Sequence, residues 1–240
     1  MVSLFPRRKR FASSTRQRSR RPNPDQVVNR VGLSELTPGL AHFLGQAAYL
    51  QLSFFEGLSR AVTAAPSTAS KEAASRVAAI ALDRHHQLVA ELERAGLDPS
   101  EAMEPFVHPI DAFQLRTAGN DWFEALLAYY VGSGILDDAF AGIAQGLPGG
   151  YSERIPELLS NETGHGIVAA ELRSAIDDHP QLASRLALFG RRLVGDLLLV
   201  ARSALDLPKD TASDDARLEP VLTELIADHT RRMDDLGLTA

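Results

Sequence analysis

Two acid-x-x-histidine pairs stand out among the residues that could do chemistry. Asp83 and His86 lie in the run ALDRHHQL, and Glu162 and His165 lie in the run NETGHG. Residues three apart project from the same face of a helix, so each pair could offer a carboxylate and an imidazole to one ion. One such pair is expected by chance, but the spacing occurs twice among only seven histidines. The repetition predicts two helices that each present an acid and a histidine.

A dinuclear metal site would also need one carboxylate from each of two other helices. Glu56 is the only acid in a long apolar segment, where it is either an inner ligand or a surface residue. Asp137 follows Ser133 by one turn on an apolar face, whereas Asp138 is expected to face solvent. Carboxylate and imidazole ligands suit iron or manganese. The predicted metal ligands are therefore Glu56, Asp83, His86, Asp137, Glu162 and His165.

Long helices would have to position these residues, and helix signals dominate the chain after residue 30. Apolar residues recur at helical spacing, and strand signals are scarce. Proline, glycine and polar turns predict helices at about 37–65, 71–96, 121–146, 150–178, 180–205 and 215–235. Short turns join the first helix to the second and the third to the fourth, which predicts two antiparallel hairpins.

The connection between the two hairpins is unusually long. It reads LDPSEAMEPFVHPIDAFQLRTAGN, which is more than 20 residues and exceeds the usual loop length. Such a segment is long enough to run back along a bundle. We therefore predict an all-α fold, namely a ferritin-like four-helix bundle with a long crossover between its second and third helices. The last two predicted helices are additional C-terminal helices.

Composition restricts the classes of function. The chain has 240 residues and is 45% hydrophobic, so it can bury a substantial core. It has no cysteine, which excludes a disulfide scaffold and any thiolate metal site. No stretch is apolar enough for a membrane-spanning helix, and we expect a cytoplasmic protein. A homo-oligomer is compatible with the sequence.

Charge is distributed unevenly along the chain. Residues 1–30 contain nine basic residues and one acid, whereas the remaining 210 residues carry a net charge of −14. We interpret 1–30 as a disordered basic arm, 31–207 as the helical bundle, and 208–240 as a linker with an amphipathic helix. Three readings of the arm stay open, namely a solvated tail, a contact with nucleic acid or anionic lipid, and a cleaved organellar transit segment.

Several segments between about residue 37 and residue 207 resemble one known family. They are DRHHQL, GLDPSEAMEPF with the following DAFQLRT, DWFEALLAYYVGSGILDD, NETGH and LALFGRRLVGD. The chain is similar to ferritin-like proteins related to the tRNA 2-methylthio-isopentenyladenosine hydroxylase, in particular to the actinobacterial hydroxylase-like branch.

The resemblance implies a non-haem site with two irons that activates dioxygen, and a tRNA substrate. The charge of the basic arm, taken by itself, suits contact with RNA phosphates. Carried over residue by residue, Glu56 matches the first-helix ligand, and the two acid-x-x-histidine pairs match the two motifs of the family. The third-helix carboxylate falls on Ser133 or close to it. In addition, Asp83 replaces the more usual glutamate and is one methylene shorter.

These departures leave alternatives for the site and for the function. The site holds two irons or manganese ions with Asp137 recruited, holds a single metal, or is a remnant. The first hypothesis is accordingly a di-iron oxygenase of hydroxylase type, with Arg191 and Arg192 as further RNA contacts. The alternative is a non-catalytic ferritin-like bundle that acts as a binding or scaffold protein. Metal storage is a third and less favoured reading.

Overall fold

The structure is a computed structural model that describes residues 33–205 and 211–239, with only the backbone described for 211–217. Within these ranges the chain is helical and forms no strand. The elements in chain order are η1 (Leu33–Leu36), α1 (Leu40–Ala64), α2 (Thr68–Arg94), α3 (Pro99–Thr117), α4 (Trp122–Ala144), α5 (Tyr151–Ser160), α6 (His165–Asp178), α7 (Gln181–Ser203) and α8 (Thr211–Asp235). The predicted basic arm at 1–30 lies outside the described residues.

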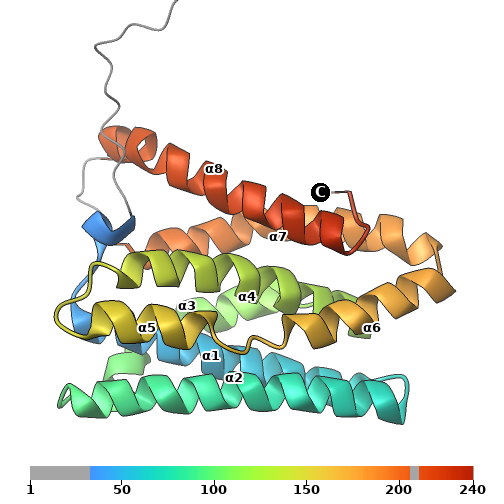
Figure 1. Cartoon of the computed structure of the whole chain (residues 1–240), viewed down its shortest axis with the longest axis horizontal. Coiled ribbons are helices and arrows are strands. Elements are labelled where there is room, and N and C mark those ends of the chain that lie inside the picture. The colour runs from blue at the N-terminus through green and yellow to red at the C-terminus, as the bar shows by residue number, and fades with distance from the viewer. Residues whose placement is uncertain (1–32, 206–210, 240) are drawn as a thin grey trace, which may run out of the picture.

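The central bundle has four helical segments. They are α1, α2, α4, and the consecutive helices α5 and α6, which together form the fourth segment (Figure 1). Helices α1 and α2 make the most extensive contact, and α4 packs against α1, α5 and α6. In Figure 1, α1 and α2 lie below α4, α5 and α6, while α7 and α8 lie above them. The prediction of an all-α, ferritin-like helical bundle with additional helices is confirmed.

Helix α4 lies at the middle of the molecule. It contacts α1, α5, α6, α7 and α8, and its side chains are buried on nearly every face. Its start is fixed by Asp121, whose side chain accepts a hydrogen bond from the backbone N–H of Glu124 at 3.0 Å. A helix buried on all sides must satisfy every polar side chain that it carries, so Ser133 and Asp137 of α4 need partners within the bundle.

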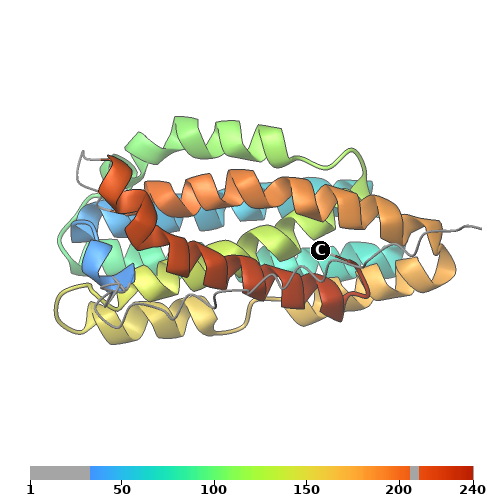
Figure 2. The same cartoon turned by 90° about the horizontal axis from the view of Figure 1, so that it is seen from above.

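The crossover between the two hairpins contains a helix that the sequence reading did not assign. Asp98 caps α3, and Pro99 occupies its first turn, where a missing N–H costs nothing. Two internal prolines, Pro105 and Pro109, disguised the helical pattern, but both lie on its exposed side. Figure 2 shows α3 along one edge of the molecule, and its contacts are chiefly with α1 and α7.

The helix predicted at 150–178 is in fact two helices, α5 and α6, so this prediction was wrong. The chain leaves helical geometry over residues 161–164. Gly164, the residue just before α6, takes a left-handed conformation with φ of 72°, which turns the chain into that helix. The break therefore lies within the segment that carries the second acid-x-x-histidine pair.

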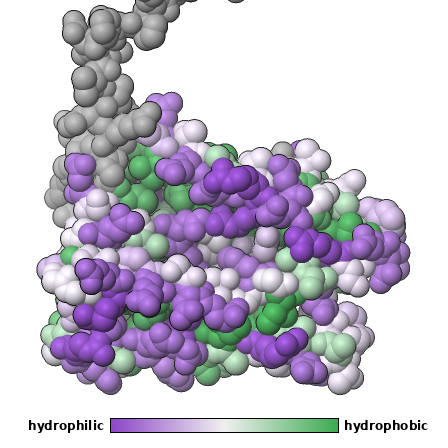
Figure 3. Space-filling model, viewed as in Figure 1, coloured by the Kyte–Doolittle hydropathy of each residue, from purple (hydrophilic) through white to green (hydrophobic). Residues whose placement is uncertain are grey.

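Helices α7 and α8 cover one side of the bundle (Figure 1). Helix α8 packs on α4 and α7, and the face shown in Figure 3 is mostly hydrophilic with separate hydrophobic patches. Among the described residues, no helix combines the length and apolar character needed to cross a membrane.

Candidate functional site at the bundle centre

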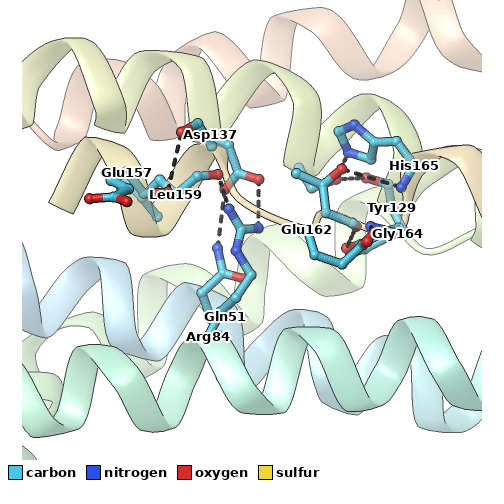
Figure 4. A network of polar contacts seen from close by, with 12 residues as sticks. Gln51, Arg84, Tyr129, Asp137, Glu157, Leu159, Glu162, Gly164 and His165 are labelled. Carbon is cyan, nitrogen blue, oxygen red and sulfur yellow. Dashed lines mark hydrogen bonds and ion pairs between the residues drawn. The ribbon is translucent and has the colours of Figure 1, made fainter. Parts of the chain in front are cut away.

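The centre of the bundle contains an ion pair between Arg84 of α2 and Asp137 of α4. Nη1 of Arg84 donates to Oδ2 of Asp137 at 2.8 Å, and the two side chains are 3% and 8% exposed. Nε2 of Gln51, on α1, donates to Oδ1 of Asp137 at 3.1 Å. Nη2 of Arg84 also donates to the carbonyl oxygen of Leu159, on α5. Each of the four bundle segments thus contributes one group to a single network (Figure 4).

The electrostatics of this network follow from its burial. Burial raises the pKa of Asp137 above its ordinary value, while the charge of Arg84 and the hydrogen bonds from Arg84 and Gln51 oppose that shift. A buried charge without a partner is very costly, so the pair must stay together. The guanidinium of Arg84 is thus a fixed cation in the bundle core, the region into which ferritin-like di-iron proteins direct their metal ligands. Oε1 of Gln51 and Nε of Arg84 have no partner among the described residues.

A second polar cluster lies beside the first, around the start of α6. Oγ of Ser133 lies 2.6 Å from Nε2 of His165 and donates to the backbone carbonyl of Tyr129 at 2.7 Å. The hydroxyl of Tyr129 donates to the carbonyl of Thr163 at 2.8 Å. Since Oγ donates its hydrogen to Tyr129, Nε2 of His165 must carry a hydrogen that it donates to Ser133.

Burial and the nearby cations Arg232 and Arg84 lower the pKa of His165 to about 4, so its imidazole is neutral at pH 7. Burial raises the pKa of Tyr129, and the charge of Asp137 adds to this shift, so the phenol stays protonated. The cluster is therefore a set of neutral hydrogen-bonding groups at physiological pH.

Glu162 and the neighbouring glycine shape the break between α5 and α6. Oε1 of Glu162 accepts a hydrogen bond from the backbone N–H of Gly164 at 3.0 Å, and the side chain is exposed. A Cβ atom on Gly164 would lie 3.0 Å from Cγ1 of Val77. By contrast, a Cβ on Gly166 would meet nothing within 4 Å. Of Gly164 and Gly166, only Gly164 has the left-handed backbone conformation that favours glycine.

The remaining predicted ligands lie on outward-facing parts of α1 and α2. The side chain of Glu56 is 55% exposed and lies 3.9 Å from Arg60. Asp83 and His86 are both exposed, and Oδ2 of Asp83 accepts a hydrogen bond from Gln87 one turn along the same helix.

Of the six residues predicted as metal ligands, only Asp137 and His165 face the interior. Asp137 already neutralises Arg84, and His165 is hydrogen-bonded to Ser133. The spacing of Glu162 and His165 does not place them on one helical face, because only His165 belongs to α6. This donor set does not fit a dinuclear metal centre in the arrangement observed.

Two residues at the centre, Arg84 and Gln51, were missed by the sequence reading, although the sequence carries a signal for both. Arg84 follows the buried Val77 and Ala81 at helical spacing. Gln51 lies seven residues from the buried Leu44 and seven from the buried Leu58. A search along the apolar stripe of each helix would have found both residues.

The predicted RNA contacts are only partly within the described residues. Arg191 and Arg192 are exposed on α7, and the guanidinium of Arg192 lies over the ring of Phe189 at 5.2 Å. As expected, Asp138 faces solvent, where it pairs with Arg232.

The chain matches a family model but no curated protein. Residues 35–207, which include the whole bundle with its crossover and α7, match the family described as "Ferritin-like domain, actinomycetes". The chain therefore belongs to the ferritin-like domain family of actinomycetes.

Proposed function

We propose that this protein is a ferritin-like bundle that works as a binding or scaffold protein without a resident di-iron centre. The observation that carries the proposal is the buried network of Arg84, Asp137 and Gln51. A guanidinium in the centre repels metal cations, and the one central carboxylate is already neutralised by it. The ion pair and its hydrogen bonds to Gln51 and Leu159 link the four bundle segments at this point.

The di-iron hydroxylase implied by the sequence resemblance would require a different arrangement of two helices. Asp83 and His86 flank Arg84 and His85 on α2, and those inner residues are buried. Rotating α2 to bring Asp83 inward would turn Arg84 and Leu88 out of the core. That rotation would expose apolar surface and leave Asp137 as an unpaired buried charge. The geometry therefore favours the binding or scaffold function over oxygen chemistry.

Metal analysis of natively expressed protein, followed by anaerobic loading with Fe(II), tests the proposal. We expect well under one iron per chain and no near-ultraviolet absorption of an oxo-bridged pair after exposure to air. The variant Glu162→Ala should leave the metal content unchanged, as should the matched control Glu153→Ala on the exposed side of α5. About two irons per chain, lost in Glu162→Ala and kept in Glu153→Ala, would overturn the proposal and restore the hydroxylase.

RNA binding through the basic arm is a separate prediction that rests on charge alone. Nine basic residues within 1–30 would neutralise RNA phosphates, so the affinity should fall steeply with salt. Deleting residues 1–30 should remove that salt dependence in a filter-binding titration with tRNA. Equal binding by the full chain and the truncated chain would exclude the arm as the contact.

A further inference from the structure

A pocket with a volume of about 360 Å³ opens between α1, α3, the segment joining α3 to α4, and the first half of α4. It lies apart from the Arg84–Asp137 network, and none of the six predicted metal ligands lines it. Ligand pockets in proteins occupy about 300–1,000 Å³, so this one suits a small ligand.

The walls of the pocket are apolar. They include Phe54, Leu58, Phe113, Ala125 and the ring of Tyr129. Phe54 and Tyr129 pack edge to face with ring centroids 5.5 Å apart, so this part of the wall is firmly held. An apolar lining of this kind favours a ligand with a hydrocarbon body.

One end of the pocket is closed by a tight turn that needs a glycine. A Cβ atom on Gly119 would lie 2.5 Å from the backbone nitrogen of Ala125 and 2.5 Å from Cβ of Glu124. Only glycine allows the segment before α4 to fold this closely onto the first turn of that helix. The same turn places the indole of Trp122 in the pocket wall.

Trp122 contributes the body of its indole to the pocket wall. The residue is only 6% exposed, and its Nε1 atom is buried out of reach of a water molecule, with no hydrogen-bond partner among the described residues. The indole N–H is therefore not offered to a ligand, and the ring acts as part of the apolar wall.

A cation lies at the mouth of the pocket. Arg60 is exposed, and its contact with Glu56 is long, at 3.9 Å. A Cβ atom on Gly57 would lie 3.7 Å from Oε1 of Gln114 and 3.9 Å from Nη2 of Arg60, so both polar groups lie close to Gly57. An exposed pair such as Arg60 and Glu56 contributes little, which leaves the guanidinium able to bind another anion.

The acidic groups near the pocket already have partners. Asp121 pairs with Arg185, which also approaches Glu124 at 3.7 Å. Oε2 of Glu124 accepts hydrogen bonds from the backbone N–H of Asn120 at 2.9 Å and from its side-chain amide at 2.8 Å. Their negative charges are therefore compensated locally, whereas the positive charge at the mouth has only its distant contact with Glu56.

We propose that this pocket binds a small monocarboxylate with an apolar body. The hydrocarbon part lies against Phe54, Leu58 and Phe113, and the carboxylate meets Arg60 at the mouth. The inference rests on the proposed binding function and names its ligand class, but it uses a region distinct from the bundle centre.

Titration with three eight-carbon compounds tests the ligand class on the full chain. Octanoate, 1-octanol and octylammonium share the same hydrocarbon chain and differ in charge. Trp122 is the only tryptophan, so its fluorescence reports directly on the pocket. We expect octanoate to bind most tightly and octylammonium most weakly, as measured by fluorescence and isothermal titration calorimetry below micelle-forming concentrations. Equal binding of octanoate and octylammonium, or no binding of octanoate, would overturn the proposal.

Four variants locate the contacts. Arg60→Gln should weaken octanoate about threefold to tenfold and leave 1-octanol unchanged. The exposed Arg76→Gln on α2 is its control and should change neither. Ala125→Phe should fill the pocket and block both ligands, whereas Ala79→Phe, at an exposed position of α2, should not. Circular dichroism and the thermal transition establish that each variant is folded.

A fifth variant tests the indole wall. Trp122→Phe keeps an aromatic ring but removes part of the apolar surface, so calorimetry should show octanoate and 1-octanol each weakened about fivefold. Unchanged affinities in both Trp122→Phe and Ala125→Phe would mean that binding occurs elsewhere and would refute this site. Metal analysis distinguishes this proposal from the proposed function. Two irons per chain would refute the metal-independent function, whereas binding of octanoate in the pocket would still be judged by the titrations alone.

Discussion

Tyr129 separates two regions of the molecule that have opposite chemistry. Its ring lines the apolar pocket, while its hydroxyl donates to the carbonyl of Thr163 on the side of the polar cluster. At the bundle centre, Arg84 and Asp137 neutralise one another. At the mouth of the pocket, the cation Arg60 is exposed and has a long contact with Glu56, at 3.9 Å. The two regions of the bundle therefore differ in how closely the protein itself pairs the cation.

The difference shows which polar groups are structural and which are available to a ligand. Gln51 and Arg84 are held in the centre by hydrogen bonds to Asp137. The side chain of Arg60, by contrast, is 68% exposed at the mouth of the pocket. The ion pair closes the centre, and the exposed cation marks the pocket as the region able to accept an anionic ligand.

The largest expected effect comes from breaking the central ion pair. Arg84→Met leaves Asp137 buried without its cation, so the free energy of unfolding should fall by about 3–5 kcal/mol. The double variant Arg84→Met/Asp137→Leu removes both charges and should regain much of that loss, although the amide of Gln51 and the carbonyl of Leu159 then lack their partners. Urea unfolding of the two variants measures both values.

The same double variant sharpens the contrast with the pocket. Its octanoate affinity should equal that of the original protein, because neither changed residue lines the pocket. If Arg84→Met alone lowers the free energy of unfolding by less than about 1 kcal/mol, the account of a centre closed by an ion pair is wrong.

Acid should lower the free energy of unfolding through His165, in the polar cluster beside Tyr129. The pKa of His165 is about 4 in the folded protein and 6.5 in a free histidine, so folding disfavours its protonated form. The stabilisation is therefore complete above about pH 6.5 and is lost as the pH falls towards 4, with a total near 3 kcal/mol. Urea unfolding at pH 7.5 and pH 4.5 should show this loss.

His165→Gln should flatten that pH dependence, although not completely. Burial also lowers the pKa of His229, and this shift acts in the same direction. The exposed His108→Gln is the control and should keep the full acid sensitivity. A variant at His165 that loses as much stability in acid as the original protein would show that this histidine does not carry the effect.

Helical periodicity predicted the fold because it reports directly on burial. The same periodicity placed Asp137 inward and Asp138 outward, but it was not applied to Glu56, Asp83 and His86, which were chosen by residue type and local spacing. The apolar spacing of α1 turns Gln51 inward and Glu56 outward, and that of α2 turns Arg84 inward and Asp83 outward. The contents of the bundle centre were therefore readable from the sequence.

Other features depend on contacts that the sequence does not display. The pairing of Arg84 with Asp137 joins residues 53 positions apart. The pocket requires the close fold at Gly119, and the break before α6 requires the left-handed backbone of Gly164. A glycine in a sequence is compatible with many conformations, so only its neighbours in space reveal which one is needed.

The two glycines beside His165 offer a matched test of that break. Gly164→Ala must adopt a left-handed conformation and displace Val77, which should cost about 1–2 kcal/mol or more. Gly166→Ala lies within α6 with open space around it, so it should stabilise the protein by about 0.5–1 kcal/mol. Thermal unfolding of both variants should give shifts of opposite sign. Shifts of the same sign would contradict the assignment of the break to Gly164.

The smallest effects should come from the outward-facing predicted ligands of α1 and α2. Glu56→Ala, Asp83→Ala and His86→Ala remove exposed side chains, so each should change the free energy of unfolding by no more than about 0.5 kcal/mol. The neighbouring His85→Ala is the contrasting variant, because Nδ1 of His85 lies 2.9 Å from the buried carbonyl of Ala48.

Removing the imidazole of His85 leaves that carbonyl unsatisfied and should cost about 1–3 kcal/mol. Asp83, His85 and His86 lie within four positions of one helix, so helix propensity alone cannot produce such a contrast between them. If His86→Ala proves as damaging as His85→Ala, the observed orientation of α2 is wrong. A rotated α2 would carry Asp83 and His86 towards the bundle centre, and the metal site predicted from their spacing would again be tenable.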